Sequence, residues 1–168
     1  MFRFKKNKIT ALTRLFWIYK NQNQFQEAFK VLLKRKEVII SLENKDNYYF
    51  ANLISTDHNL AIIKNILGLH EEARSLLMET LPRLPIVYEG LDKNDYFLKL
   101  NISSTLNIIG ESYLKDSKNN TSSYLDSASV YFKRAYNITK AFTPPHKNSE
   151  TIFLSWHQNR LLHPNSNV

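Results

Sequence analysis

The sequence predicts an all-α fold built of antiparallel helical hairpins. Apolar residues recur at the three- and four-residue spacing of amphipathic helices along most of the chain. No stretch alternates with a period of two for long enough to form a strand, and the 3 Gly among 168 residues are fewer than tight β-turns usually need. A chain of this length is expected to form one domain, spanning residues 1–168.

Polar breaks, glycine and proline divide this pattern into about seven helices. The expected helices are two within 9–42, then 47–66, 70–81, 92–115, 123–141 and a closing helix at 149–162. Gly68 suits the left-handed turn after the third helix, and Pro82 and Pro85 end the fourth. Asp92 is a candidate N-cap for the fifth helix. Residues 116–122 are polar, so we expect a turn from which six residues can be deleted with little loss of stability.

The net charge of +8 is concentrated at the N-terminus. Residues 1–36 hold ten basic side chains against Glu27 alone, a balance of +9, so the rest of the chain sums to −1. Nucleic-acid-binding domains more often spread a basic face over the whole fold. Residues 3–8 are expected to precede the first helix as a basic tail beside a solvated helix face. Contact with an acidic partner or with phosphates is the alternative interpretation.

The sequence lacks the residues or motifs that several kinds of functional site require. The absence of Cys excludes disulfides, thiolate catalysis and Cys-ligated metal sites, although it does not identify a compartment. No apolar run reaches about 18 residues, so no membrane contact is expected, and without an export signal the cytoplasm is the default location. There is no phosphate-binding loop, nucleophile elbow or His-Glu-x-x-His pair, and the five His are scattered. We therefore expect no enzyme activity, catalytic residue, metal or cofactor.

A helix-turn-helix pattern recurs three times along the chain. Its central alanines, Ala28, Ala73 and Ala128, are 45 and 55 residues apart, and each is expected to be buried where two helices cross. The middle unit combines a small residue in its first helix (Ala61), Gly at the turn, Glu-Glu-Ala opening its second helix, and a closing Pro. This combination resembles the tetratricopeptide repeat (TPR). The spacing departs from the family's usual repeat of about 34 residues.

The TPR resemblance implies a short right-handed superhelix of units 9–43, 47–85 and 92–141, followed by the closing helix. The first unit departs from the family by having Phe16 where a small residue is usual and Asn23 where Gly is usual. The third unit has a turn that is six residues longer. Its Tyr124–Ala135 segment resembles the sensory arrays of bacterial regulators. Because little chain remains after residue 162, a stand-alone adaptor, a truncated member and a fragment are all open.

The function that the resemblance implies is non-catalytic protein or peptide binding in bacterial signalling or regulation. In this family peptides bind the inner face, which is lined by the first helix of each pair. The positions carried over are Thr10, Thr13, Trp17, Lys20 and Asn21 in the first unit, Ser55, His58, Ile62 and Asn65 in the second, and Ser104, Asn107, Glu111 and Lys115 in the third. Lys20 could face a carboxylate there, and Trp17 could pack on an apolar side chain.

Three alternatives to peptide binding remain open at this point. The inner face could be merely solvated. The basic first unit could serve a nucleic-acid-associated helical-repeat protein, although nucleic acid is not the expected partner. The chain could also form a homo-oligomeric scaffold through a terminal hairpin.

Overall fold

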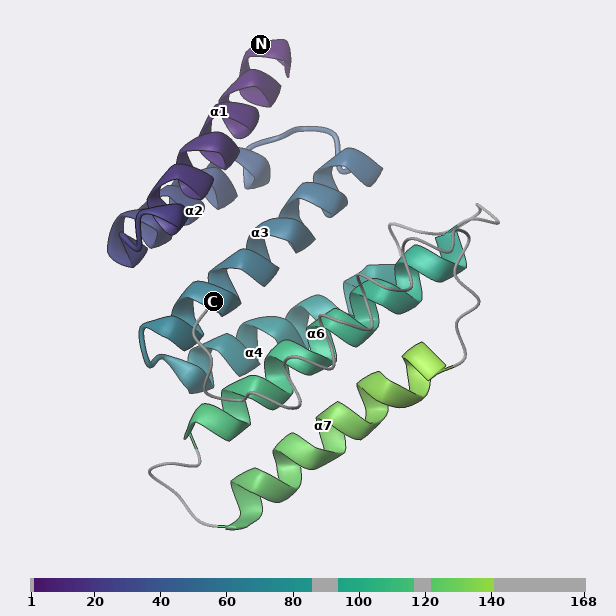
Figure 1. Cartoon of the computed structure of the whole chain (residues 1–168). Helices are drawn as coiled ribbons and strands as arrows, with labels where there is room; N and C mark the ends of the chain where they lie inside the picture. The colour runs from purple at the N-terminus through teal and green to yellow at the C-terminus, as the bar shows by residue number, and fades with distance from the viewer. Residues whose placement is uncertain (1, 86–93, 117–121, 141–168) are drawn as a thin grey trace.

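The computed structural model describes residues 2–85, 94–116 and 122–140, and all regular structure in these ranges is helical (Figure 1). The elements are α1 (Phe2–Asn21), α2 (Phe25–Ile40), α3 (Asn47–Ile66), α4 (His70–Thr80), the 3₁₀ helix η1 (Leu81–Arg83), α6 (Asn94–Asp116) and α7 (Ser122–Lys140). The prediction of an all-α fold is therefore confirmed. The expected closing helix at 149–162 and the candidate cap Asp92 lie outside the described residues.

Each helix packs mainly on the helices that precede and follow it in the chain. α1 contacts α2, α2 contacts α3, α3 contacts α4, α4 contacts α6, and α6 contacts α7, with a smaller contact between α3 and α6. Figure 1 shows this succession, with α1 and α2 at one end and α7 at the other. The apolar core is consequently a series of clusters between neighbouring helices. One cluster joins α1, α2 and α3 around Leu32, and another joins α3, α4 and α6 around Ala73.

The first two helical hairpins have the same local structure at an offset of 45 residues. α1 and α3 both start and end 45 residues apart, and α2 and α4 also begin 45 residues apart. Asn23 and Gly68 take the left-handed conformation at the two turns, with φ of 57° and 81°. Asn is among the few residues besides Gly that tolerate this conformation, so the first turn forms without glycine.

The backbone hydrogen bonds of the two turns also correspond. Gln24 N donates to Tyr19 O at 2.9 Å, and Leu69 N, 45 positions later, donates to Lys64 O at 2.8 Å. These bonds satisfy a carbonyl in the last turn of the preceding helix. The same hairpin is therefore built twice from largely different residues.

The predicted burial of the recurring alanines is confirmed, since Ala28, Ala73 and Ala128 are all buried. Replacing Ala73 by Leu should overpack the contact among α3, α4 and α6 and lower the free energy of unfolding by about 1–3 kcal/mol. Urea denaturation followed by circular dichroism measures this change. Ser75, exposed on the same helix, provides the control: Ser75→Leu should leave stability nearly unchanged. Equal midpoints for the Ala73 variant and the wild type would contradict the close crossing.

The first helix begins earlier than the sequence pattern indicated. Residues 3–8 lie within α1, so the prediction that they precede the first helix is wrong. This segment contains neither Gly nor Pro, and its Lys and Arg residues are good helix formers. Tertiary contacts also hold it: Lys5 Nζ donates to Ser41 O at 2.7 Å, and Lys6 Nζ lies 4.2 Å from the centre of the Tyr48 ring. The basic side chains therefore project from an ordered helix.

A buried carboxylate lies where four elements meet, namely α2, α3, α4 and η1. Asp57 on α3 is fully buried, and its Oδ1 atom lies 2.7 Å from Lys36 Nζ on α2. Its Oδ2 atom lies 3.8 Å from Arg83 Nη1 on η1 and accepts from Thr80 Oγ1 at 3.4 Å. This group of four residues ties the second hairpin to the first.

A second polar group connects α4 to α6. Arg74 is buried, donates to Asp116 Oδ2 at 2.8 Å, and lies over the Tyr113 ring at 4.5 Å from its centre. Asp116 is the last residue of α6 and the first residue of the turn that we expected to be removable. A deletion that includes it would leave the buried guanidinium without its carboxylate, so we expect a deletion that includes Asp116 to be destabilising. Residues 117–121 lie outside the described residues.

Candidate partner-binding surface

The exposed side of α1 carries several large apolar side chains. Leu12 and Phe16 on this helix pack against α2 and α3, whereas Phe4, Leu15, Trp17 and Ile18 are exposed. Single exposed apolar residues are common on soluble proteins, but several on one helix, among them Leu15 and Ile18 one turn apart, are typical of an interaction surface. This side of α1 is therefore the candidate surface.

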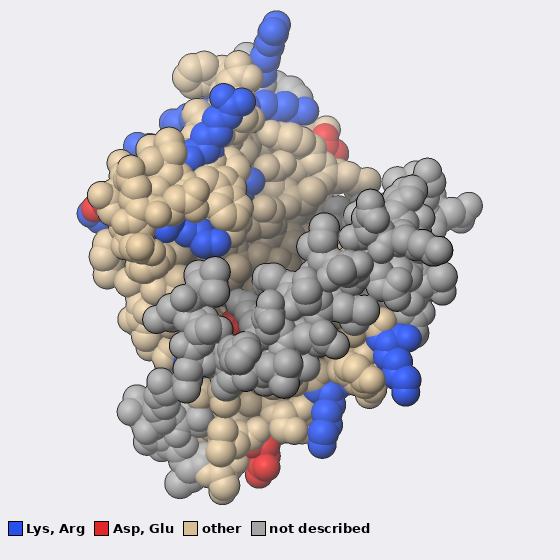
Figure 2. All heavy atoms as spheres, viewed as in Figure 1, with Lys and Arg blue, Asp and Glu red and all other residues tan. Residues whose placement is uncertain are grey.

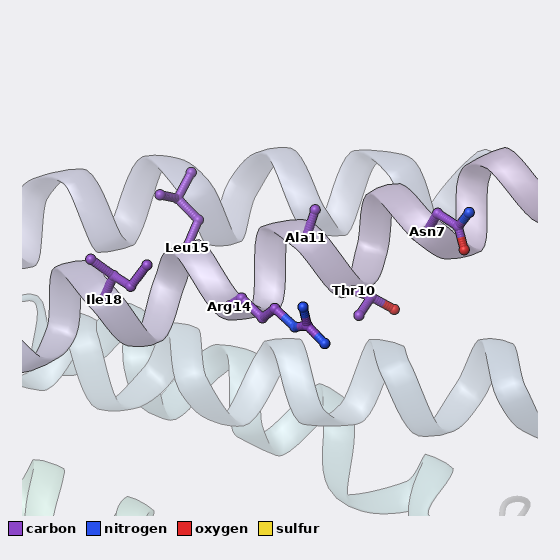
Figure 3. Close-up of a pocket in the computed structure, with 6 residues that line it drawn as sticks. All are labelled: Asn7, Thr10, Ala11, Arg14, Leu15 and Ile18. Atoms are coloured by element: carbon purple, nitrogen blue, oxygen red, sulfur yellow. The ribbon is translucent and has the colours of Figure 1, made fainter.

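A shallow pocket runs along this side of the helix. Figure 3 shows the six side chains that line it, which all come from α1: Asn7, Thr10, Ala11, Arg14, Leu15 and Ile18. The three- and four-residue spacing of these positions places them along one stripe of the helix. Phe4 continues the stripe one turn toward the N-terminus. We call Phe4 and these six residues the α1 outer face.

The helix that carries this face has six basic and no acidic residues. Lys5 and Lys6 are held by the contacts with Ser41 and Tyr48, and Lys20 Nζ lies 4.6 Å from the centre of the Trp17 ring. In the described part of the chain, no ion-pair partner is found for the other three, Arg3, Lys8 and Arg14. Figure 2 shows basic side chains gathered at the end of the molecule where α1 lies. The α1 outer face therefore combines apolar side chains with one cation, Arg14, and Arg3 and Lys8 on the same helix add further positive charge.

The sequence-predicted groove residues of α1 are divided between this face and the rest of the helix. Trp17 and Asn21 are exposed, and Thr10 belongs to the pocket. Lys20 is half-buried and contacts the Trp17 ring, while Thr13 is half-buried and donates to Ile9 O at 2.8 Å. The tryptophan and lysine predicted to meet a peptide thus lie together and accessible.

The groove residues predicted on α3 and α6 are less accessible. Asn65 is buried and its Nδ2 atom donates to Ile108 O on α6 at 3.4 Å, while Asn107 is also buried. His58 Nε2 and Thr105 Oγ1 are 2.7 Å apart, which joins α3 to α6. Burial lowers the pKa of His58 to about 4, so the imidazole is neutral at pH 7. These side chains hold helices together instead of lining an open groove.

The remaining predicted positions are divided between exposed and partly buried surroundings. Ile62, Glu111 and Ser104 are half-buried, whereas Ser55 and Lys115 are exposed. The structure therefore does not assemble the thirteen carried-over residues into one accessible surface. The accessible members gather mainly on α1.

Sequence reasoning missed most of the α1 outer face, including Asn7, Arg14, Leu15 and Ile18. A signal for them was present in the 45-residue offset. Leu15 and Ile18 have identical counterparts in Leu60 and Ile63, so the two helices share an apolar stripe besides the inner-face positions.

Other kinds of site find little support in the described ranges. Within residues 2–85, 94–116 and 122–140, no three His, Asp or Glu side chains cluster as metal ligands would. No described helix combines the length and apolar character needed to span a bilayer. Comparison with known proteins finds no matching family model, no matching curated protein and no matching solved structure.

Nucleic-acid binding should be weak, because the basic residues of the first hairpin point to different contacts. Lys30 pairs with Glu27, Lys36 with Asp57, and Arg35 is buried between α2 and α3. We expect only sequence-independent binding that disappears near about 0.15 M salt, where surface charges are screened. Electrophoretic mobility shifts across a salt series measure this. A tight, sequence-selective shift at that salt concentration would contradict the expectation.

Proposed function

We propose that the protein is a non-catalytic helical-repeat module that binds a protein partner through α1. The observation that carries this proposal is the α1 outer face, where exposed Leu15 and Ile18 line a shallow pocket together with Arg14. Trp17 is exposed on the same helix, and the ion pairs of the described residues include none with Arg3, Lys8 or Arg14. Protein interfaces commonly combine an apolar centre with a polar rim, and Trp and Arg are enriched among the residues that dominate binding energy.

The duplicated hairpin supports a repeat architecture of the TPR-like kind. Hairpins that pack on their sequence neighbours form arrays whose elongated surfaces serve as binding sites. Proteins of this kind act as adaptors, and a role in bacterial signalling or regulation is part of the proposal. This role is proposed because the middle unit resembles the TPR and the Tyr124–Ala135 segment resembles the sensory arrays of bacterial regulators.

Site-specific photo-crosslinking tests this function in cells that produce the protein naturally. A photoreactive amino acid is placed at Thr10 or at Asn21, which are exposed on α1, and the control carries it at Lys133, which is exposed on α7. We expect both α1 positions to capture the same protein, identified by mass spectrometry, and the control position not to capture it.

The alternatives give different adducts. Nucleic-acid adducts at both α1 positions would replace the proposed function by the nucleic-acid alternative. Adducts of the chain with itself would indicate a self-assembling scaffold. Capture of the same protein at Lys133 with equal yield, or the absence of any adduct on α1, would also contradict binding through this helix.

A further inference from the structure

The α1 outer face corresponds in sequence position to a surface of α3 that is buried in the fold. At the 45-residue offset, the exposed apolar residues of α1 match residues of α3 that are buried. Leu15 and Ile18 are 36% and 52% exposed, whereas their counterparts Leu60 and Ile63 are 2% and 0% exposed. The other matched pairs are Phe4 with Tyr49 and Ala11 with Thr56, and both α3 residues are buried.

On α3 this surface is covered by the preceding helix, α2. Leu60 and Ile63 lie in one cluster with Val31 and Leu32 of α2. The buried Arg35 guanidinium of α2 packs against the N-terminal half of α3, next to these apolar contacts. It donates from Nη2 to Asn52 Oδ1 at 2.9 Å and from Nη1 to Thr56 Oγ1. The chain therefore contains a template for a helix docked on this surface, namely aliphatic residues with one charged side chain inserted among them.

The pocket on α1 lies at the position equivalent to the Arg35 site. Asn7 corresponds to Asn52, and Ala11 corresponds to Thr56, which leaves room where the threonine side chain stands on α3. Arg14 takes the place of Asn59 and lines the pocket. A cation at this position disfavours an incoming arginine and favours a carboxylate, with which Arg can form two parallel hydrogen bonds.

We infer that the α1 outer face binds an acidic amphipathic helix of a partner protein, which packs on α1 as α2 packs on α3. A carboxylate of that helix occupies the place that Arg35 takes on α3, near Arg14 and Asn7. Its aliphatic residues cover Leu15 and Ile18, and Arg3 and Lys8 supply further positive charge. This inference rests on the proposed function and names the partner's chemistry.

Charge favours a foreign acidic helix over a second copy of this chain. The second helices of the hairpins are the elements that cover this kind of surface. Of these, α7 carries Lys133, Arg134 and Lys140 against Asp126, and α2 is also net basic. α4 is acidic, but it is already packed between α3 and α6. None of these helices therefore offers an acidic surface that is free to dock on α1 of another copy.

Binding of designed peptides tests the inference directly. The first probe is a fluorescent, hydrocarbon-stapled peptide with the sequence of residues 25–42, the helix that covers α3. The second probe has glutamate in place of Lys30, Lys34, Arg35 and Lys36. At low salt we expect the acidic peptide to bind the intact chain at least about ten-fold more tightly than the basic one, as measured by fluorescence anisotropy.

Variants of the α1 outer face should then separate its apolar and charged contributions. Ile18→Glu should weaken binding of the acidic peptide about ten-fold, because it places a charge in the apolar contact. Arg14→Glu should weaken the acidic peptide by a similar factor and strengthen the basic one. Val130→Glu, at an exposed apolar residue of α7, is the matched control and should change neither affinity. Circular dichroism verifies that each variant is folded.

Specific results would overturn the inference. Equal binding of the two peptides, or binding of the acidic peptide that is indifferent to both α1 variants, would reject it. Vesicles containing phosphatidylserine serve as a competing probe. Binding to these vesicles that is lost in Ile18→Glu, without acidic-peptide binding, would assign the face to a membrane surface. If the peptides fail while crosslinking on α1 still captures a protein, the proposed function stands and only the acidic-helix partner is rejected.

Discussion

Replacing Asp57 by Ala should lower the free energy of unfolding by about 3 kcal/mol. The carboxylate is fully buried and faces Lys36 and Arg83, so its removal leaves two cations near one another without the anion between them. Because the Lys36 and Arg83 side chains are part exposed, the loss should lie at the lower end of the cost of removing one member of a buried ion pair. Urea denaturation of the purified variant measures the loss.

A double-mutant cycle identifies the origin of this loss. Lys36→Met removes one of the cations while keeping the aliphatic stem, so the Asp57→Ala/Lys36→Met variant should lose less stability than the sum of the single variants. Lys34→Met, at an exposed lysine on the same helix, is the matched control and should lie within about 0.5 kcal/mol of wild type. Additive effects of Asp57→Ala and Lys36→Met would show that the two charges are not coupled.

Acidification from pH 6.5 to pH 4 should destabilise the wild type partly through His58. Burial lowers the pKa of this imidazole from 6.5 to about 4, so the folded state binds the proton less readily than the unfolded state does. The neutral His58 contributes its full stabilisation above pH 6.5, the pKa of the imidazole in the unfolded chain. This stabilisation is lost as the pH falls toward about 4, the pKa of the imidazole in the folded protein. A difference of this size corresponds to about 3 kcal/mol across the interval.

His58→Gln isolates this contribution because glutamine can still bond Thr105 but does not titrate. We expect the variant's stability to fall about 3 kcal/mol less than that of the wild type over the same interval. Burial also lowers the pKa of His70, so His70 too destabilises the folded state as the pH falls. Burial raises the pKa of Asp57, so this residue has the opposite effect on stability over the same interval. Both residues are present in the two proteins, so they largely cancel from the comparison. Superimposable pH profiles would show that His58 does not carry the effect.

Local signals were sufficient to predict the helices of the described chain. α3 spans Asn47–Ile66 as expected, because Asp46 caps its first turn by accepting from Tyr49 N and Gly68 ends the turn after it. The start of α1 could not be predicted in the same way. The residues before Ile9 lack an apolar period, and their helix is held by contacts with Ser41 and Tyr48, which are distant in sequence.

The candidate site was only partly predictable for the same physical reason. The TPR resemblance implied Trp17 and Lys20 as neighbours on one helix surface, and the Trp17 ring and the Lys20 charge do lie together on α1. The burial of Asn65 and Asn107 depends on how closely α3 and α6 approach, which no local pattern encodes. Asp57 occupies the position that Leu12 has in the first hairpin. Its burial as a charged residue depends on Lys36 and Arg83, which reach it from two other elements.

The sequential packing of the helices has a consequence for how the protein opens. Because most contacts join consecutive helices, the short loops that close during folding carry a small entropic cost, and such topologies fold rapidly. The same arrangement lets the N-terminal hairpin fray without disrupting the contacts between α6 and α7. Fraying of that hairpin must separate Lys36 from Asp57 and withdraw the Arg35 guanidinium from Asn52 and Thr56, all of which join α2 to α3. Amide hydrogen exchange should therefore slow between α1 and α3, where these polar contacts and the apolar cluster around Leu32 must be broken together.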